Sequence, residues 1–252
     1  MVEIDDFEEI MEISEYQNIF ENEEKHFYYV TIHSLVLGLI GKYVRVGPRK
    51  ILDAGCGTGG LLKKLCAFGE ASGVDISPEA IKYSRKRGLV LKCAGVTNLP
   101  FPEESFDVVT SIDVIYHKAV GDDVEALKEM RRVLKEEGVL ILRVPANKYL
   151  LSAHDREVHT ARRYSKKDIG DKMTKAGFHI KQISYVGMVL FPLSLVKILL
   201  ERIFGNASSS SIDSLPSWIN WCFTQVLMLE NRLILSGISL PFGQGLIVVA
   251  QR

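Results

Sequence analysis

The chain has 252 residues, 47% of them hydrophobic, and its 31 Lys and Arg residues balance 31 Asp and Glu residues to a net charge of zero. This length and apolar content are enough for one sizeable α/β core. A neutral chain lacks the basic excess with which nucleic-acid-binding proteins contact phosphates, so we expect no DNA or RNA substrate. The four cysteines show no metal-type pairing and the N-terminus is acidic, unlike a signal peptide. Both features favour a reducing, cytoplasmic location.

Taken in chain order, the predicted elements begin with a helical segment over residues 1–47, whose apolar residues between 35 and 40 would cover the ligand side of the core. From residue 50 onward, strand-like apolar runs alternate with helical segments. Strands are expected near 50–54, 71–75, 89–93, 106–110 and 138–144, then near 180–186 and 245–251. Ser77 with Pro78, and Ser165 with Asp168, are typical helix starts. The alternation predicts a doubly wound, mostly parallel, Rossmann-like sheet of seven strands in one domain, residues 1–252.

An apolar helical insertion is expected over residues 187–243, because a plain hairpin between the last two strands would need far fewer residues. Its apolar run is interrupted by Pro192, Lys197 and Glu201, so it falls short of the ~20 apolar residues that span a membrane. We expect a cap over the site or a face buried against protein, including a homodimer interface. A substrate tunnel or a peripheral contact with a membrane surface stays open as an alternative.

The most informative stretch is residues 51–60, where a short apolar strand ends in a glycine-rich turn and a helix follows. Such a turn lets backbone N–H groups approach a ligand at the positive end of the helix. Gly55, Gly57 and Gly60, with Asp75 further on, also satisfy the spacing of a dinucleotide fingerprint. Asp53 decides between the ligands, because a carboxylate repels a pyrophosphate and attracts the ammonium group of an amino-acid moiety.

Further motifs follow in order: Gly73 to Ser77, Leu99 to Phe101, Ser105 to Val109, and Arg132 to Leu140. With them, residues 48 to 145 resemble the class I S-adenosylmethionine-dependent methyltransferases, in the small-molecule, type 11-like branch. The resemblance implies an antiparallel last strand, S-adenosylmethionine as cofactor, and methyl transfer to a small-molecule or lipid-like acceptor. Two alternatives stay open: a non-catalytic S-adenosylmethionine-binding protein, and, with less support, an NAD-dependent oxidoreductase.

The cofactor site is carried over from this resemblance, residue by residue. It implies contacts from Asp53, Gly55, Cys56, Gly57, Asp75, Ile76, Val96 and Asp113. Asp75 would accept hydrogen bonds from both ribose hydroxyls. The family usually has an aspartate before the Leu-Pro-Phe turn to bind the adenine amino group, but this chain has Gly95 there. The backbone around Gly95 and Val96 would then have to bind the adenine ring.

The acceptor site is predicted from a segment rich in ionisable side chains, residues 154–164, which follows the fifth strand. Ligands of open α/β sheets bind beyond the carboxyl ends of the strands. Three interpretations are ranked in this order: an acceptor site with His154 or His159 as general base, an ion-pair cluster that pins the loop, and a metal site, which we do not adopt. The catalytic candidates are His154 and His117, and His117 fits a hydrogen-bonded wall residue equally well. The substrate-binding candidates are His26, Tyr28, Tyr116, His159, Arg162, Arg163 and Tyr164.

Overall fold

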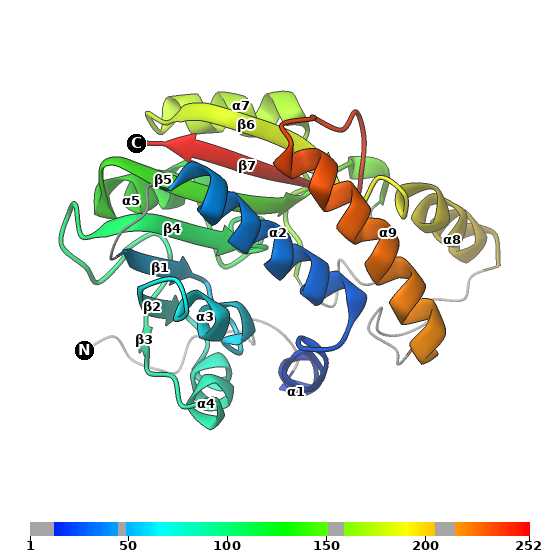
Figure 1. Cartoon of the computed structure of the whole chain (residues 1–252), viewed down its shortest axis with the longest axis horizontal. Coiled ribbons are helices and arrows are strands. Elements are labelled where there is room, and N and C mark those ends of the chain that lie inside the picture. Colours follow the sequence, from blue (N-terminus) through cyan, green and yellow to red (C-terminus); the bar gives the residue numbers. More distant parts are fainter. Residues whose placement is uncertain (1–12, 45–48, 151–158, 205–214) are drawn as a thin grey trace.

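The computed structural model describes residues 13–44, 49–150, 159–204 and 215–252, and Figure 1 shows a twisted sheet with helices on both faces. The strand order is β3-β2-β1-β4-β5-β7-β6. The strands are β1 (Lys50–Ala54), β2 (Glu70–Asp75), β3 (Leu91–Cys93), β4 (Phe106–Ile112), β5 (Leu134–Pro145), β6 (His179–Val186) and β7 (Gly245–Gln251). Strands β1 to β5 pair in parallel, whereas β7 lies antiparallel between β5 and β6. The predicted seven-stranded Rossmann-like sheet with an antiparallel last strand is confirmed.

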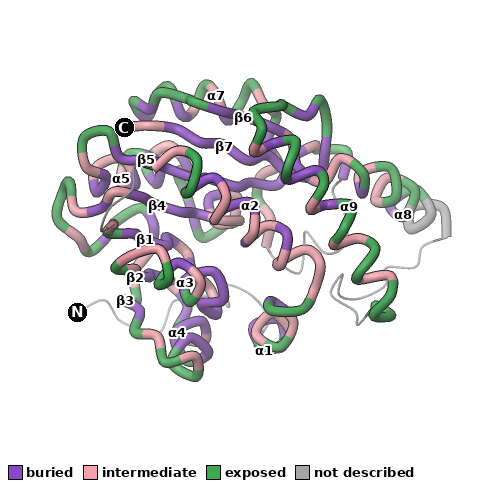
Figure 2. Tube along the Cα trace, in the orientation of Figure 1, coloured by how far each residue is buried: buried purple, intermediate pink, exposed green. Residues whose placement is uncertain are grey.

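The helices divide the core into two layers. The helices are α1 (Ile13–Asn22), α2 (Phe27–Tyr43), α3 (Gly60–Leu65), α4 (Pro78–Lys86), α5 (Asp123–Val133), α7 (Lys166–Lys175), α8 (Phe191–Phe204) and α9 (Ser217–Leu235), with a short 3₁₀ turn at Lys148–Leu150. Because side chains alternate along a strand, Val108 packs under α2 and α3, whereas its neighbour Val109 packs under α5 and α7. Both valines are fully buried, as parallel strands covered on both faces require (Figure 2).

Helix capping follows the predicted pattern. The Ser77 hydroxyl accepts a hydrogen bond from the amide of Ala80, with Pro78 at the first helical position of α4. The Ser165 hydroxyl accepts from the amide of Asp168 at the start of α7. These side chains satisfy backbone N–H groups that a helix start leaves without partners.

The segment between β6 and β7 forms α8 and α9, and α9 lies along α2 (Figure 1). The Asn231 side-chain amide donates to the carbonyl of Thr31 at 2.7 Å, and Gln182 on β6 donates to the carbonyl of Ile234 at 2.7 Å. Ile234 is fully buried in the layer that α2 forms on the sheet. One side of α9 is therefore part of the core, while the other side is exposed (Figure 2).

No helix in the described part of the chain is both long and apolar enough to cross a membrane.

Candidate functional site

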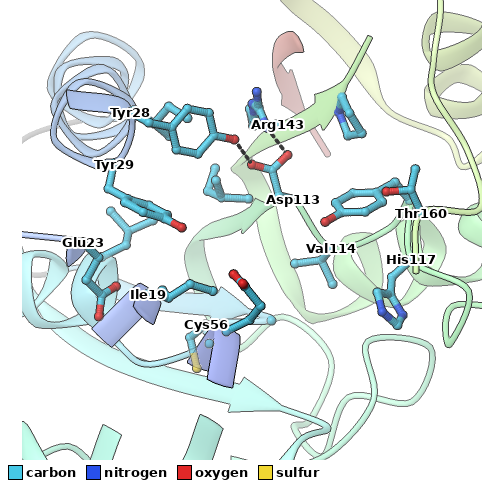
Figure 3. Close-up of a pocket in the computed structure, with 18 of the residues that line it drawn as sticks. Ile19, Glu23, Tyr28, Tyr29, Cys56, Asp113, Val114, His117, Arg143 and Thr160 are labelled. Carbon is cyan, nitrogen blue, oxygen red and sulfur yellow. Dashed lines mark hydrogen bonds and ion pairs between the residues drawn. The ribbon is translucent and has the colours of Figure 1, made fainter. Parts of the chain in front are cut away.

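A cavity of about 680 Å³ lies at the carboxyl ends of the parallel strands, where the sequence predicted the site. Figure 3 shows residues that line it, drawn from the N-terminal helices, the glycine-rich turn after β1, and the segments that follow β4 and β5. The same cavity is lined by Leu193 and Ile198 of α8, by Phe223 of α9, and by Leu190, which directly precedes α8. From the predicted helical cover, residues between 15 and 33 reach the cavity, whereas Leu35 to Ile40 pack on the sheet instead.

The turn after β1 needs glycine because the side chain of Val114 lies directly against it. Gly55 has φ +82°, and a Cβ there would collide with the side chain of Val114. The amides of Gly55 and Cys56 both donate to the carbonyl of Val74, which fixes the turn on β2. This close approach holds the turn beside Asp113 and Val114, so that the ends of β1 and β4 form one wall of the cavity.

The Asp75 carboxylate is held at the edge of this turn. It accepts hydrogen bonds from the amide of Gly57 at 2.9 Å and from the amide of Ser77 at 2.9 Å. Burial raises the pKa of Asp75 above its usual range, and the backbone hydrogen bonds oppose that rise. The carboxylate also lines the cavity, where its oxygens can accept hydrogen bonds from hydroxyl groups of a ligand.

Asp53 ends β1 and is only 2% exposed. Its Oδ1 accepts a hydrogen bond from the Thr110 hydroxyl at 2.7 Å. The pKa of Asp53 is raised to about 7, mainly by burial, while the Thr110 hydrogen bond lowers it and the charges of Asp75 and Glu23 add to the rise. Two more carboxylates, Glu15 and Glu23, line the same end of the cavity. This end is suited to a cationic ligand.

Glu23 was missed by the sequence analysis, although it holds the glycine-rich turn. It follows α1, is 4% exposed, and accepts from the Thr58 hydroxyl at 2.5 Å and the Gly60 amide at 3.1 Å. Arg87 forms an ion pair with it at 2.5 Å. A Cβ at Gly60 would collide with this carboxylate. Nothing in the acidic N-terminal sequence marks this glutamate, because its partners come from distant segments.

At the other end of the cavity, Asp113 links two side chains (Figure 3). It has φ +57°, and its Oδ2 accepts from the Tyr28 hydroxyl at 2.9 Å. Its Oδ1 pairs with Arg143, which lies on β5 and was also missed by the sequence analysis. The available signal was a charged residue inside the apolar run of β5. Burial raises the pKa of Tyr28 well above its usual range, so the hydroxyl stays protonated and donates to Asp113.

His117 lines the cavity, and its hydrogen bonding defines its chemistry. Nδ1 accepts the amide N–H of Ala119 at 3.0 Å, so in the neutral ring the proton sits on Nε2. Nδ1 is thus engaged by the backbone. The ring centroid of His159 lies 5.9 Å away, although His159 itself does not line the cavity.

The other predicted residues divide between the cavity and its support. All eight predicted cofactor residues line the cavity, as do His26, Tyr28, Tyr116 and Arg163. Ala94, Gly95 and Thr97 join Val96 in the wall, and none of these four carries a carboxylate. His26 caps α2 through Nδ1, which accepts from the amide of Tyr28, and burial lowers the pKa of His26.

Arg162 and Tyr164 do not line the cavity. The Arg162 guanidinium donates to the carbonyls of Val120 at 2.8 Å and Gly121 at 2.7 Å. The Tyr164 hydroxyl is buried and donates to Asp123 at 2.8 Å. These two side chains tie the segment after β5 to the segment after β4.

His154, the first candidate for a general base, lies outside the described residues, as does Asp155. Within the described ranges, no three or more His, Cys, Asp or Glu side chains come together as a metal site would require.

Comparison with known proteins agrees with this geometry. Residues 52–142 match the family model of a methyltransferase domain. The malonyl-[acyl-carrier protein] O-methyltransferase of Halorhodospira halophila is 34% identical over 150 residues, which are 54% of this chain and 50% of that protein. The demethylmenaquinone methyltransferase of Staphylococcus haemolyticus is 36% identical over 108 residues, 39% of this chain and 44% of that protein. The chain thus spans about half or less of the length of these relatives.

Other relatives bear names of rRNA and tRNA methyltransferases, matched over 37% to 40% of this chain. Among solved structures, an S-adenosylmethionine-dependent methyltransferase from Thermotoga maritima aligns over 95% of both chains with a TM-score of 0.58 and 21% identity. At that identity the likeness supports the fold alone.

Proposed function

We propose that this chain, which belongs to the class I S-adenosylmethionine-dependent methyltransferases, transfers a methyl group to a small-molecule or lipid-like acceptor. The observation that carries the proposal is one cavity with two chemically different ends. Four carboxylates line the glycine-turn end, and the other end combines arginines with the apolar side chains of α8 and α9. The proposal treats residues 1–252 as one cytoplasmic domain, with residues 187–243 as a cap.

The carboxylate-lined end fits the cofactor. S-adenosylmethionine, when bound, supplies a methyl group already activated on a positively charged sulfur. In the proposal, Asp53 attracts the ammonium group of its methionine moiety, and Asp75 accepts from its ribose hydroxyls. The wall formed by Gly95 and Val96 faces the adenine ring. Support for this orientation comes from the turn itself, since a Cβ at Gly57 would meet no atom within 4 Å and therefore faces open space.

Acceptor alignment falls to the residues at the opposite end. Methyl transfer needs donor and acceptor in line with water excluded, and these two effects can supply much of the rate enhancement. We propose that Tyr28, Tyr116 and His117 position the acceptor. The cap residues from α8 and α9 would exclude water.

RNA is the second candidate acceptor, favoured only by the names of some relatives. The net charge of zero and a cavity closed partly by apolar helices support a small acceptor instead. A non-catalytic role would leave the cofactor site intact. An NAD-dependent role is opposed by Asp53, which would face the pyrophosphate.

Isothermal titration tests the cofactor assignment. We expect S-adenosylhomocysteine to bind and NAD not to bind, because the ligand end presents carboxylates. Transfer of labelled methyl groups from S-adenosylmethionine to extracted small molecules and to total RNA would then identify the acceptor class. Binding of NAD without binding of S-adenosylhomocysteine would refute the proposal. Labelling of RNA alone would show that the acceptor is RNA and not a small molecule. Tight binding of S-adenosylhomocysteine with no labelling of any fraction would indicate the non-catalytic role.

The affinity for S-adenosylhomocysteine should rise about tenfold between about pH 6 and about pH 8, because only ionised Asp53 attracts the ammonium group. The pKa of Asp53 lies at about 7, above its usual value of 3.8. In the free protein, this raised pKa makes a contribution to the stability of the folded state. The contribution is fully present below the usual pKa of 3.8 and is lost as the pH rises through about 7. Titrations at several pH values measure the slope. An Asp53→Asn variant should lose it, and an equal slope in that variant would contradict the assignment.

We also retain a peripheral membrane contact through residues 187–243, with a homodimer as the alternative. Trp218 is 69% exposed and Trp221 62% exposed on α9, and Leu193 is 55% exposed on α8. Apolar exposure of this kind is typical of an interface. We expect the protein to sediment with lipid vesicles, and a Trp218→Ser/Trp221→Ser double variant to sediment less. Val90→Ser, at a 91% exposed site directly before β3, is the control. Loss of a dimer in the double variant, with no sedimentation of either protein, would favour the homodimer.

A further inference from the structure

Three buried polar side-chain atoms in the described part of the chain have no hydrogen-bond partner: Glu15 Oε2, His26 Nε2 and Arg143 Nε. All three belong to residues that line the cavity. Buried polar groups are normally satisfied, so three such atoms around one cavity indicate that a polar ligand belongs in it. Arg143 carries the most information, because a guanidinium is always charged and has five N–H donors.

Arg143 is buried with few partners. Its side chain is 7% exposed, and its hydrogen bonding within the described residues is limited to the pair between Nη1 and Asp113. Its Cζ lies 5.2 Å from the centre of the Tyr28 ring. The fold makes room for this side chain, because a Cβ at Gly245 on β7 would come within 2.7 Å of Nη2. A buried charged group with unsatisfied N–H donors destabilises the fold unless a further acceptor binds those donors.

The charges around the cavity are distributed unevenly. Glu15, Glu23, Asp53 and Asp75 gather around the glycine-rich turn. Beyond the ends of β4 and β5, Arg143 and Arg163 line the cavity with Asp113 as their carboxylate neighbour. Arg163 is anchored there by a bond from Nη1 to the carbonyl of Ala146 at 3.0 Å. Among the described residues, this end therefore carries two cations and one carboxylate, whereas the cofactor end carries four carboxylates.

An apolar wall continues from this positive end. Its residues are Leu190, directly before α8, Leu193 and Ile198 of α8, Phe223 of α9, and Leu150 from the segment after β5. The side-chain amide of Gln244, which also lines the cavity, donates a hydrogen bond to the Ser194 hydroxyl. A ligand that extends from the arginines along this wall would therefore meet mainly hydrocarbon, which favours an apolar body.

We propose that the methyl acceptor is an amphipathic anion, with a carboxylate or phosphate group bound by Arg143 and Arg163 and an apolar body against α8 and α9. This inference rests on the proposed function and specifies its acceptor. An anionic oxygen would accept from the unused donors of Arg143, which are strongest toward charged acceptors. Arg143 and Arg163 thereby determine specificity, and neither takes part in the displacement.

The test uses the full chain saturated with S-adenosylhomocysteine and titrates three probes of equal chain length: dodecanoate, dodecyl phosphate and dodecanol. We expect at least one anion to bind about tenfold more tightly than the alcohol, in line with charge-assisted hydrogen bonds. Preference for dodecanoate or for dodecyl phosphate identifies the anionic group. Equal affinity for all three probes, or tighter binding of the alcohol, would overturn the inference without any variant.

Variants assign the effect to Arg143. Arg143→Met should weaken binding of the preferred anion about tenfold and leave the affinity for dodecanol unchanged. Arg85→Met, which removes the same charge from an exposed site on α4, should change neither affinity. If Arg143→Met fails to fold, the Arg143→Met/Asp113→Asn double variant removes the pair without leaving an unpaired carboxylate. Undiminished anion preference in a folded variant lacking Arg143 would overturn the assignment. Absence of S-adenosylhomocysteine binding in the wild-type chain would instead count against the proposed function.

Discussion

Replacing Glu23 with alanine should lower the free energy of unfolding by about 3 kcal/mol, the usual cost of breaking a buried ion pair. Its carboxylate accepts from Thr58 and Gly60 and pairs with Arg87, whose side chain is 7% exposed. Removal leaves that guanidinium with the carbonyls of Phe20 and Thr58 and the carboxylate of Glu24. Urea unfolding followed by circular dichroism measures the change.

Glu24→Ala is the matched control for this experiment. Glu24 is the next residue and also pairs with Arg87, at 2.8 Å, but its side chain is 48% exposed. Exposed ion pairs contribute at most about 1 kcal/mol, so the control should unfold close to the wild type. Equal destabilisation by the two variants would show that burial of Glu23 is not what ties the N-terminal helices to the glycine-rich turn.

Local patterns predicted the fold well because they act over short distances. Apolar runs located the seven strands, and Ser77 and Ser165 located two helix starts. The largest boundary difference is at β5, expected near 138–144 and observed over Leu134–Pro145. Its first residues extend the strand because Leu134 pairs with Phe106 across a register shift in β4, which periodicity does not reveal.

The cofactor end could be predicted because its residues are close in sequence or follow a motif. Glu23 and Arg143 could not be, since their roles depend on partners brought together by the fold. Thr58 is 35 residues from Glu23, and Asp113 is 30 residues from Arg143. In a single sequence, a glutamate in an acidic stretch looks like a solvated surface residue.

In the segment after β5, the sequence could not distinguish the roles of neighbouring residues. The sequence treated Arg162, Arg163 and Tyr164 alike, as contacts of the acceptor. In the structure, Arg163 lines the cavity, whereas its two neighbours point to the carbonyls and the carboxylate of residues 115–123. Consecutive residues of an extended chain point to opposite sides, and composition alone does not specify which side faces a ligand.

Asp75→Ala should weaken binding of S-adenosylhomocysteine ten- to a hundredfold, about 1.5 to 3 kcal/mol for the loss of two hydrogen bonds to a charged acceptor. The same carboxylate accepts from the amides of Gly57 and Ser77, so the variant also loosens the turn that faces the ligand. Asp75→Asn keeps a side-chain oxygen for one of these amides and should lose less affinity than Asp75→Ala. Isothermal titration measures both variants, with Glu79→Ala as the control, because Glu79 pairs with Lys82 on α4 outside the cavity. If Asp75→Ala binds the ligand as tightly as the control does, Asp75 does not contact the ribose and the cofactor must lie differently in the cavity.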